Sequence, residues 1–70
     1  MTPIQIIARH AAVEPHPSDI LTEIGIDQAT RITLAMELEG ELGIHLSDAE
    51  LFMASTVGDL ARVVEGRVAA

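Results

Sequence analysis

The apolar residues of this chain recur at intervals of three and four, and this spacing constrains the fold more than any other feature. Leu34, Ala35, Leu38 and Leu42 form one continuous stripe on a helical wheel. No stretch alternates between apolar and polar residues over a length that would predict a strand. Phe52 is the only aromatic residue, so aliphatic side chains and methionine must build the core. The pattern predicts an all-α protein.

The length limits what the chain can do. Seventy residues suffice for one domain, which we expect to span residues 1–70. A domain of this size buries only about 60% of its unfolded surface and has little room for a catalytic cleft. No nucleophile with an adjacent base can be assembled from these residues, so we expect no enzymatic activity.

The chain is strongly acidic, with a net charge of -7 and no lysine. This charge repels nucleic acid and anionic membranes, and no apolar run approaches the roughly 20 residues of a membrane-spanning helix. The sequence contains no cysteine, which favours a cytoplasmic location. We expect a monomer whose partners present basic surfaces.

A first helix is predicted at the start of the chain. Thr2 can cap it, with Pro3 at its first position, and we expect it to end near Val13. Three apolar residues share one face of this helix: Ile4, Ile7 and Ala11.

A long loop follows, because two prolines disfavour helix from Glu14 to about Asp19. The connection exceeds the roughly two to eight residues usual between helices of a bundle. We therefore expect it to pack onto the core, with a helical turn around Leu21. Four apolar residues at its end would make this contact: Ile20, Leu21, Ile24 and Ile26.

The second helix begins after Asp27, a favourable N-cap, and ends at Gly43. Ile32 and Met36 lie between its apolar and polar stripes, so this helix carries more apolar surface than one core contact needs. Either the long loop covers the two side chains or a partner does. The polar stripe consists of four residues: Thr30, Thr33, Glu37 and Glu41.

Two further helices complete a four-helix bundle in which the third helix is short. Ser47 and Glu50 predict a capping box at the start of the third, with Leu51 and Phe52 as its apolar contact. Thr56 begins a related pattern, after which a fourth helix is expected to extend to about Arg67. Its apolar stripe contains four valine and leucine residues: Val57, Leu60, Val64 and Val68.

Three segments carry a resemblance to a known family: L-T-E-I-G-I-D from Leu21 to Asp27, L-A-M-E-L-E-G-E-L-G-I from Leu34 to Ile44, and T-V-G-D-L from Thr56 to Leu60. In order and spacing they resemble the acyl carrier proteins and the related peptidyl carrier domains. The resemblance implies a four-helix carrier fold. It also implies that the second helix is the main docking surface for basic partner enzymes.

The resembled family opens its second helix with Asp-Ser-Leu, and the serine carries 4'-phosphopantetheine. The corresponding residues here are Asp27, Gln28 and Ala29, of which only Asp27 matches. A carboxamide has no hydroxyl to attack the pyrophosphate of coenzyme A. We therefore predict that Gln28 is not modified and that the chain binds no 4'-phosphopantetheine at this position.

The residues after Gln28 also depart from the family, which commonly has acidic residues there. Arg31 reverses the local charge and is poorly placed near the positive end of a helix dipole. The resemblance implies that partners contact one side of this helix. The predicted contact residues are Ala29, Ile32, Met36, Glu37 and Glu41. Glu37, Glu39 and Glu41 form either a docking face for partners or a face exposed only to solvent.

No other hydroxyl replaces the missing serine. Ser47 and Ser55 are explained as helix caps or cap neighbours, and Ser18 lies in the proline-rich loop. The three histidines lie in separate segments without the spacing of a metal site, so no metal is expected. These histidines are His10, His16 and His45.

Three functions remain open at this point. The first is a carrier-like interaction module: a scaffold, regulator or decoy for enzymes of fatty acid, polyketide or related acyl metabolism. The second is a working acyl carrier protein whose attachment serine was replaced by glutamine or lies elsewhere. The third is a protein that binds free acyl chains in its apolar interior.

Overall fold

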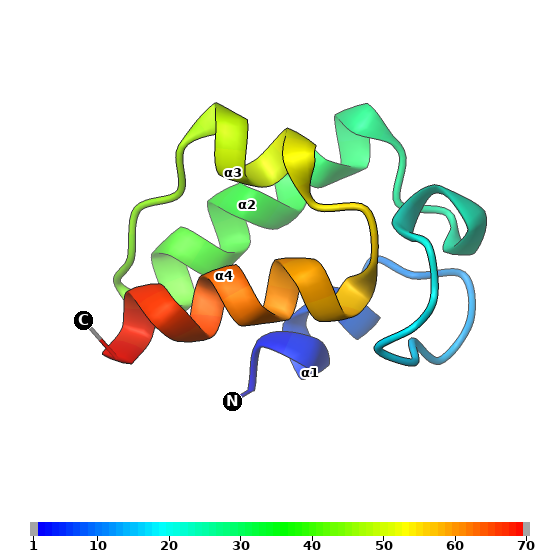
Figure 1. Ribbon diagram of the computed structural model, residues 1–70, viewed down its shortest axis with the longest axis horizontal. Helices are drawn as coiled ribbons and strands as arrows, with labels where there is room; N and C mark the ends of the chain where they lie inside the picture. The colour runs from blue at the N-terminus through cyan, green and yellow to red at the C-terminus, as the bar shows by residue number, and fades with distance from the viewer. Residues whose placement is uncertain (1, 70) are drawn as a thin grey trace.

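The computed structural model describes residues 2–69 and confirms the predicted all-α class (Figure 1). Its elements are α1 (Pro3–Ala8), the 3-10 turn η1 (Leu21–Ile24), α2 (Gln28–Leu42), α3 (Asp48–Met53) and α4 (Val57–Ala69). Within this part of the chain, the β-type pairing is a single isolated bridge between Ile20 and Thr56.

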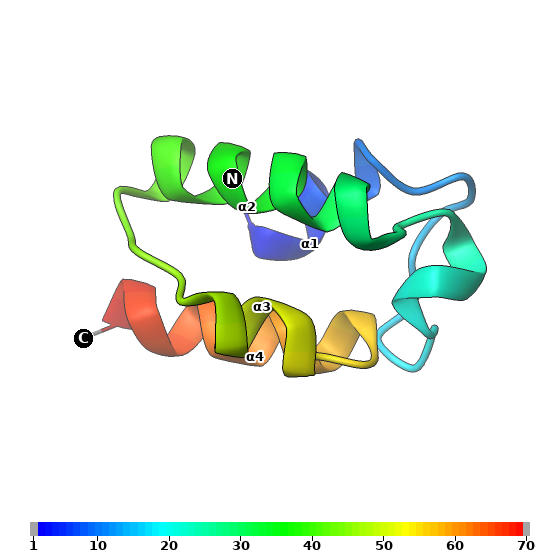
Figure 2. The same cartoon turned by 90° about the horizontal axis from the view of Figure 1, so that it is seen from above.

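The four helices close a ring around the core. Each helix packs against two others, in the order α1, α2, α3, α4 and back to α1. Seen from above, α1 lies beside α2, and α3 overlies α4 on the other side (Figure 2). The start of α2 and the start of α4 lie at the end closed by the long loop (Figure 1).

Capping residues determine where three of the helices begin, as the sequence predicts. Thr2 and Ser47 form capping boxes with Gln5 and Glu50, which satisfy N–H groups left free at the starts of α1 and α3. Asp27 caps α2. Gly43 ends α2 with φ of 65°, a left-handed conformation that glycine adopts without steric cost.

The first helix is shorter than predicted, because α1 ends at Ala8 rather than near Val13. The reason is tertiary. The backbone N–H of Ala12 donates to the carbonyl of Ile24 at 2.8 Å, so it is not available to a continuing helix. Gly25 lies opposite, where a Cβ would meet the Cβ of Ala12 at 3.3 Å. The chain therefore leaves the helix to pack against the end of η1.

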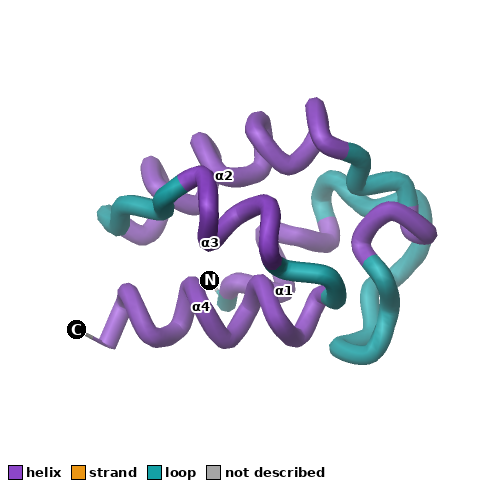
Figure 3. Tube along the Cα trace, turned by 45° about the horizontal axis from the view of Figure 1, so that its top comes forward, coloured by secondary structure: helices purple, strands orange, loops and turns teal. Residues whose placement is uncertain are grey.

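The long connection packs onto the core, as expected, and η1 is the predicted turn around Leu21 (Figure 3). Leu21, Ile24 and Ile26 are buried, but Ile20 is exposed, which corrects the prediction for that residue. The loop is also hydrogen-bonded to the start of α4. The N–H of Val57 donates to the carbonyl of Asp19 at 2.9 Å, and Gly58 donates to Pro17 at 2.8 Å.

The core is aliphatic and draws on every helix. Phe52 was expected to contribute but is 39% exposed, whereas its neighbour Leu51 is buried. The fourth helix runs two residues past the predicted Arg67, and Val68 at its end is exposed. Among residues 2–69, nine side chains are fully buried: Ile6, Ile7, Leu21, Ile26, Leu34, Leu38, Val57, Leu60 and Val64.

The helices of residues 2–69 are too short, or too polar, to cross a membrane. The longest, α2, has 15 residues and carries four charged side chains.

Candidate functional site

The start of α2 is organised by Asp27. Its backbone is extended, and its Oδ1 accepts a hydrogen bond from the N–H of Thr30 at 2.8 Å. This hydrogen bond lowers the pKa of Asp27 below its ordinary value. The carboxylate is therefore ionised at neutral pH and stabilises the positive end of the helix.

Gln28 is the first residue of α2, and its side chain is exposed at the position where the resembled family attaches its prosthetic group. The local geometry fits an attached phosphate, because an exposed helix start offers N–H groups and a favourable dipole. The chemistry does not fit. A carboxamide cannot form the phosphodiester, and Ala29 beside it offers no hydroxyl either. These residues do not accept 4'-phosphopantetheine.

The three serines lie elsewhere and have other roles or neighbours. Ser47 is the N-cap of α3, and its Oγ accepts from the N–H of Glu50 at 3.1 Å. The Ser18 hydroxyl lies 2.8 Å from Nδ1 of His16 within the long loop. Ser55 precedes Thr56, whose Oγ1 accepts from the N–H of Asp59 at the start of α4.

Arg31 is not on the outer surface of α2, contrary to the expectation that it reverses the charge there. The residue is only 8% exposed. Its Nη1 donates to the carbonyl of Leu51 at 3.2 Å and to that of Ala54 at 2.6 Å. Carbonyls at the end of a helix lack intrahelical partners and carry partial negative charge, so the guanidinium binds the end of α3.

A sequence signal for this burial exists. Arg31 lies three and four residues before Leu34 and Ala35, on the same stripe of α2. Read as part of that stripe, Arg31 faces inward. The prediction placed Arg31 on the surface instead, because arginine is rarely buried.

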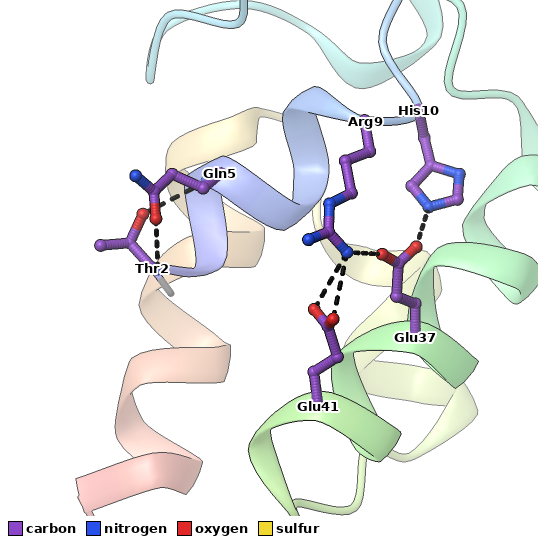
Figure 4. A network of polar contacts seen from close by, with 6 residues as sticks. All are labelled: Thr2, Gln5, Arg9, His10, Glu37 and Glu41. Atoms are coloured by element: carbon purple, nitrogen blue, oxygen red, sulfur yellow. Dashed lines mark hydrogen bonds and ion pairs between the residues drawn. The ribbon is translucent and has the colours of Figure 1, made fainter.

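Glu37 and Glu41, two of the predicted contact residues, are engaged within the molecule (Figure 4). Nη1 of Arg9 bonds to Glu37 and lies 3.1 Å from Oε1 of Glu41. Nε2 of His10 lies 2.5 Å from Oε2 of Glu37. The hydrogen bonds from His10, first, and from Arg9 lower the pKa of Glu37 below its ordinary value. The cluster joins the end of α1 to α2.

Glu39 is engaged as well. Its Oε2 accepts a hydrogen bond from the N–H of Leu46 at 2.9 Å and lies 3.3 Å from Nδ1 of His45. This contact fixes the connection from α2 to α3. Sequence spacing cannot identify it, because Leu46 lies beyond the end of the helix.

The uncharged residues among the predicted contacts are open to solvent. Ile32 is 50% exposed, Met36 is 68% exposed, and Ala29 is also exposed. The alternative in which the long loop covers Ile32 and Met36 is wrong, because both side chains are exposed.

The rest of the described structure offers a small pocket and no group of metal ligands. A mostly apolar pocket of about 170 Å³ is lined by Pro3, Leu42, Glu65, Val68 and Ala69. It lies at the opposite end of α2 from Gln28, about 20 Å away by helix rise. Within residues 2–69, no three histidine or acidic side chains converge as a metal site would require.

The chain also has relatives among known proteins. The family described as "phosphopantetheine attachment site" matches residues 4–64. An acyl carrier protein from Thermotoga maritima is 33% identical over 49 residues, which are 70% of this chain. The chain spans about 60% of the length of that relative. Proteins of this type are carriers and not catalysts. The family match over most of the chain, together with the four-helix fold, means that the chain belongs to the carrier-protein family described as phosphopantetheine attachment site.

Proposed function

We propose that this protein is a carrier-fold interaction module that holds no 4'-phosphopantetheine at Gln28. It binds enzymes of fatty acid, polyketide or related acyl metabolism as a scaffold, regulator or decoy. The exposed carboxamide at the first position of α2 is the observation that carries the proposal. The 70-residue chain acts as one monomeric domain in the cytoplasm, a location that its lack of cysteine favours.

The preserved surroundings of Gln28 support this function. The Asp27 cap is present, and the long loop that precedes it packs onto the core. A fold that is kept while its attachment residue is absent favours a role in binding. Acyl-transferring, ketosynthase-like or adenylating enzymes dock on the exposed side of α2. Ala29, Ile32 and Met36 are the uncharged contact residues that solvent reaches.

The test of this function uses coenzyme A, a broad-specificity phosphopantetheinyl transferase and intact-mass spectrometry. We expect the chain to keep its mass. The matched variant Gln28→Ser restores the hydroxyl at an otherwise suitable helix start, so we expect it to gain the prosthetic group. Modification of the unaltered chain would support the working-carrier alternative and overturn the proposal. Failure of the variant as well would mean that more than the hydroxyl is missing.

The free-acyl-chain alternative has a separate test. A ligand that binds the folded state raises the melting temperature as its concentration rises. We expect fatty acids of increasing length to leave the melting temperature unchanged, because the interior is filled by aliphatic side chains. A rise that depends on chain length would favour that alternative.

A further inference from the structure

The short helix α3 is the wall of the core that is easiest to displace from α2. α2 packs against α1 on one side and against α3 on the other. α1 buries two isoleucines completely, Ile6 and Ile7, whereas the buried residue within α3 is Leu51. Moving α3 would therefore expose less apolar surface than moving α1. An apolar chain that starts at Gln28 would enter the core with least disturbance on the α3 side.

Arg31 closes this side of the core. It lies three residues after Gln28 and is only 8% exposed. Its guanidinium joins α2 to the end of α3 through the carbonyls of Leu51 and Ala54. We call this contact of Arg31 with Leu51 and Ala54 the α2–α3 seam. Leu51, Ala54 and Leu34 belong to the core cluster, so the seam separates position 28 from the apolar interior.

Opening the seam is unfavourable for an apolar guest. An alkyl chain that passed between the helices would break both hydrogen bonds of Arg31 and could replace neither of them. Two carbonyls of buried residues would then lack a donor, and a buried cation would lack its acceptors. Both changes are penalised in a medium that contains little water.

The other polar contacts of α3 hold its beginning. Glu39 of α2 accepts a hydrogen bond from the N–H of Leu46, which lies just before the helix. Glu50 in the first turn pairs with Arg67 of α4. Arg31 is thus the residue of α2 that fixes the end of α3, and this end lies near the start of α2 (Figure 1).

We propose that Arg31 bars acyl chains from the interior of this protein by holding the end of α3 against the first turn of α2. Arg31 thereby determines which guests the core admits. The inference goes beyond the proposed function, because it concerns the interior and not the binding of enzymes. An alkyl chain that is fixed at position 28 stays outside the core, although it begins at the start of a carrier-fold helix.

The test attaches such a chain without any enzyme. The protein contains no cysteine, so Gln28→Cys introduces a single thiol. Alkylation with N-ethyl or N-dodecyl iodoacetamide then gives two proteins that differ only in the length of the alkyl group. A group that is buried in the folded state raises the melting temperature, whereas a group that stays in solvent does not.

The expected result depends on Arg31. With Arg31 present, the dodecyl and ethyl proteins should melt within about 2 °C of each other. After Arg31→Ala, the dodecyl protein should melt at least about 5 °C above the ethyl protein. Nuclear Overhauser contacts should then join the alkyl chain to the methyl groups of Leu34 and Leu51. Arg62→Ala is the matched control, because Arg62 is 82% exposed, and it should behave like the chain with Arg31.

The loss of Arg31 also lowers stability, so every chain of the series carries Gly66→Ala. A Cβ at Gly66 meets nothing within 4 Å, and alanine favours the helix over glycine. Arg31→Leu serves as a second variant, since an apolar side chain is often tolerated in place of a buried charge. It cannot bond to the carbonyls of α3, and the dodecyl group should raise its melting temperature as well.

Two results would overturn the inference. One is a rise of at least about 5 °C on dodecylation, or alkyl contacts with Leu34, in the chain that keeps Arg31. The other is equal melting temperatures of the ethyl and dodecyl proteins when the folded variants lack Arg31. The module function would stand in both cases. Phosphopantetheine on the native chain would overturn the module function without affecting these measurements.

Discussion

Replacing Arg31 by methionine should destabilise the protein more than any other exchange of an arginine. Methionine keeps much of the length of the side chain and removes the guanidinium. The carbonyls of Leu51 and Ala54, both in buried residues, then lose their donor. Each of the two hydrogen bonds from this charged donor contributes about 1.5–3 kcal/mol to stability. Removing a buried charge also removes its desolvation cost, which offsets part of the loss. We expect a net loss of about 2–4 kcal/mol.

That loss is large for this chain, because a domain of its length has a total stability of roughly 4–10 kcal/mol. Urea unfolding followed by far-UV circular dichroism would measure it, and hydrogen exchange should show α3 losing protection first. Arg62→Met is the matched control. Arg62 is 82% exposed and lies 3.9 Å from Asp59, so its loss should leave stability nearly unchanged. Equal stabilities of the two variants, or an α3 that keeps its protection without Arg31, would refute the role assigned to Arg31.

Three further predictions test other contacts. The pKa of Glu37 is lowered in the folded state, so its ionised form contributes stability that is present above its ordinary pKa and lost as pH falls through the folded-state pKa. The free energy of unfolding, measured down to a pH of about 2, should therefore fall less steeply in Glu37→Gln than in the unaltered chain. Parallel curves for the two chains would contradict this. Asp27→Ala should lower the melting temperature and Asp27→Asn should lower it less, since an amide oxygen can still accept the bond from Thr30; equal effects would argue against the cap. Gly25→Ala should lower the free energy of unfolding by about 1–2 kcal/mol, because φ is 88° and Ala12 lies close. Gly66→Ala, in open space on α4, should raise it by about 0.5–1 kcal/mol. Urea unfolding would measure both variants, and the reverse order of their stabilities would contradict the described backbone.

Local signals in the sequence were sufficient for most helix boundaries. The caps at Thr2, Asp27 and Ser47 and the stop at Gly43 each involve residues within four positions of one another, so spacing alone identifies them. The packing of Leu21 onto the core was also predictable, because the connection is long and its apolar side chains are more stable when buried. Such features depend on short-range chemistry.

Long-range contacts explain what spacing did not predict. Arg9 and Glu37 are 28 residues apart, and Arg31 and Ala54 are 23 apart, so neither pair follows from helical periodicity. The early end of α1 has the same origin, since Ala12 bonds to the carbonyl of Ile24. These contacts also change the candidate site, because they bury Arg31 and pair Glu37 and Glu41 with Arg9.

Intact-mass spectrometry of the chain isolated from its own cells tests the central claim most directly. The chain should have the mass of its unmodified sequence, with an exposed carboxamide at Gln28. A mass increased by a 4'-phosphopantetheine group, located on any residue by fragmentation, would contradict the account.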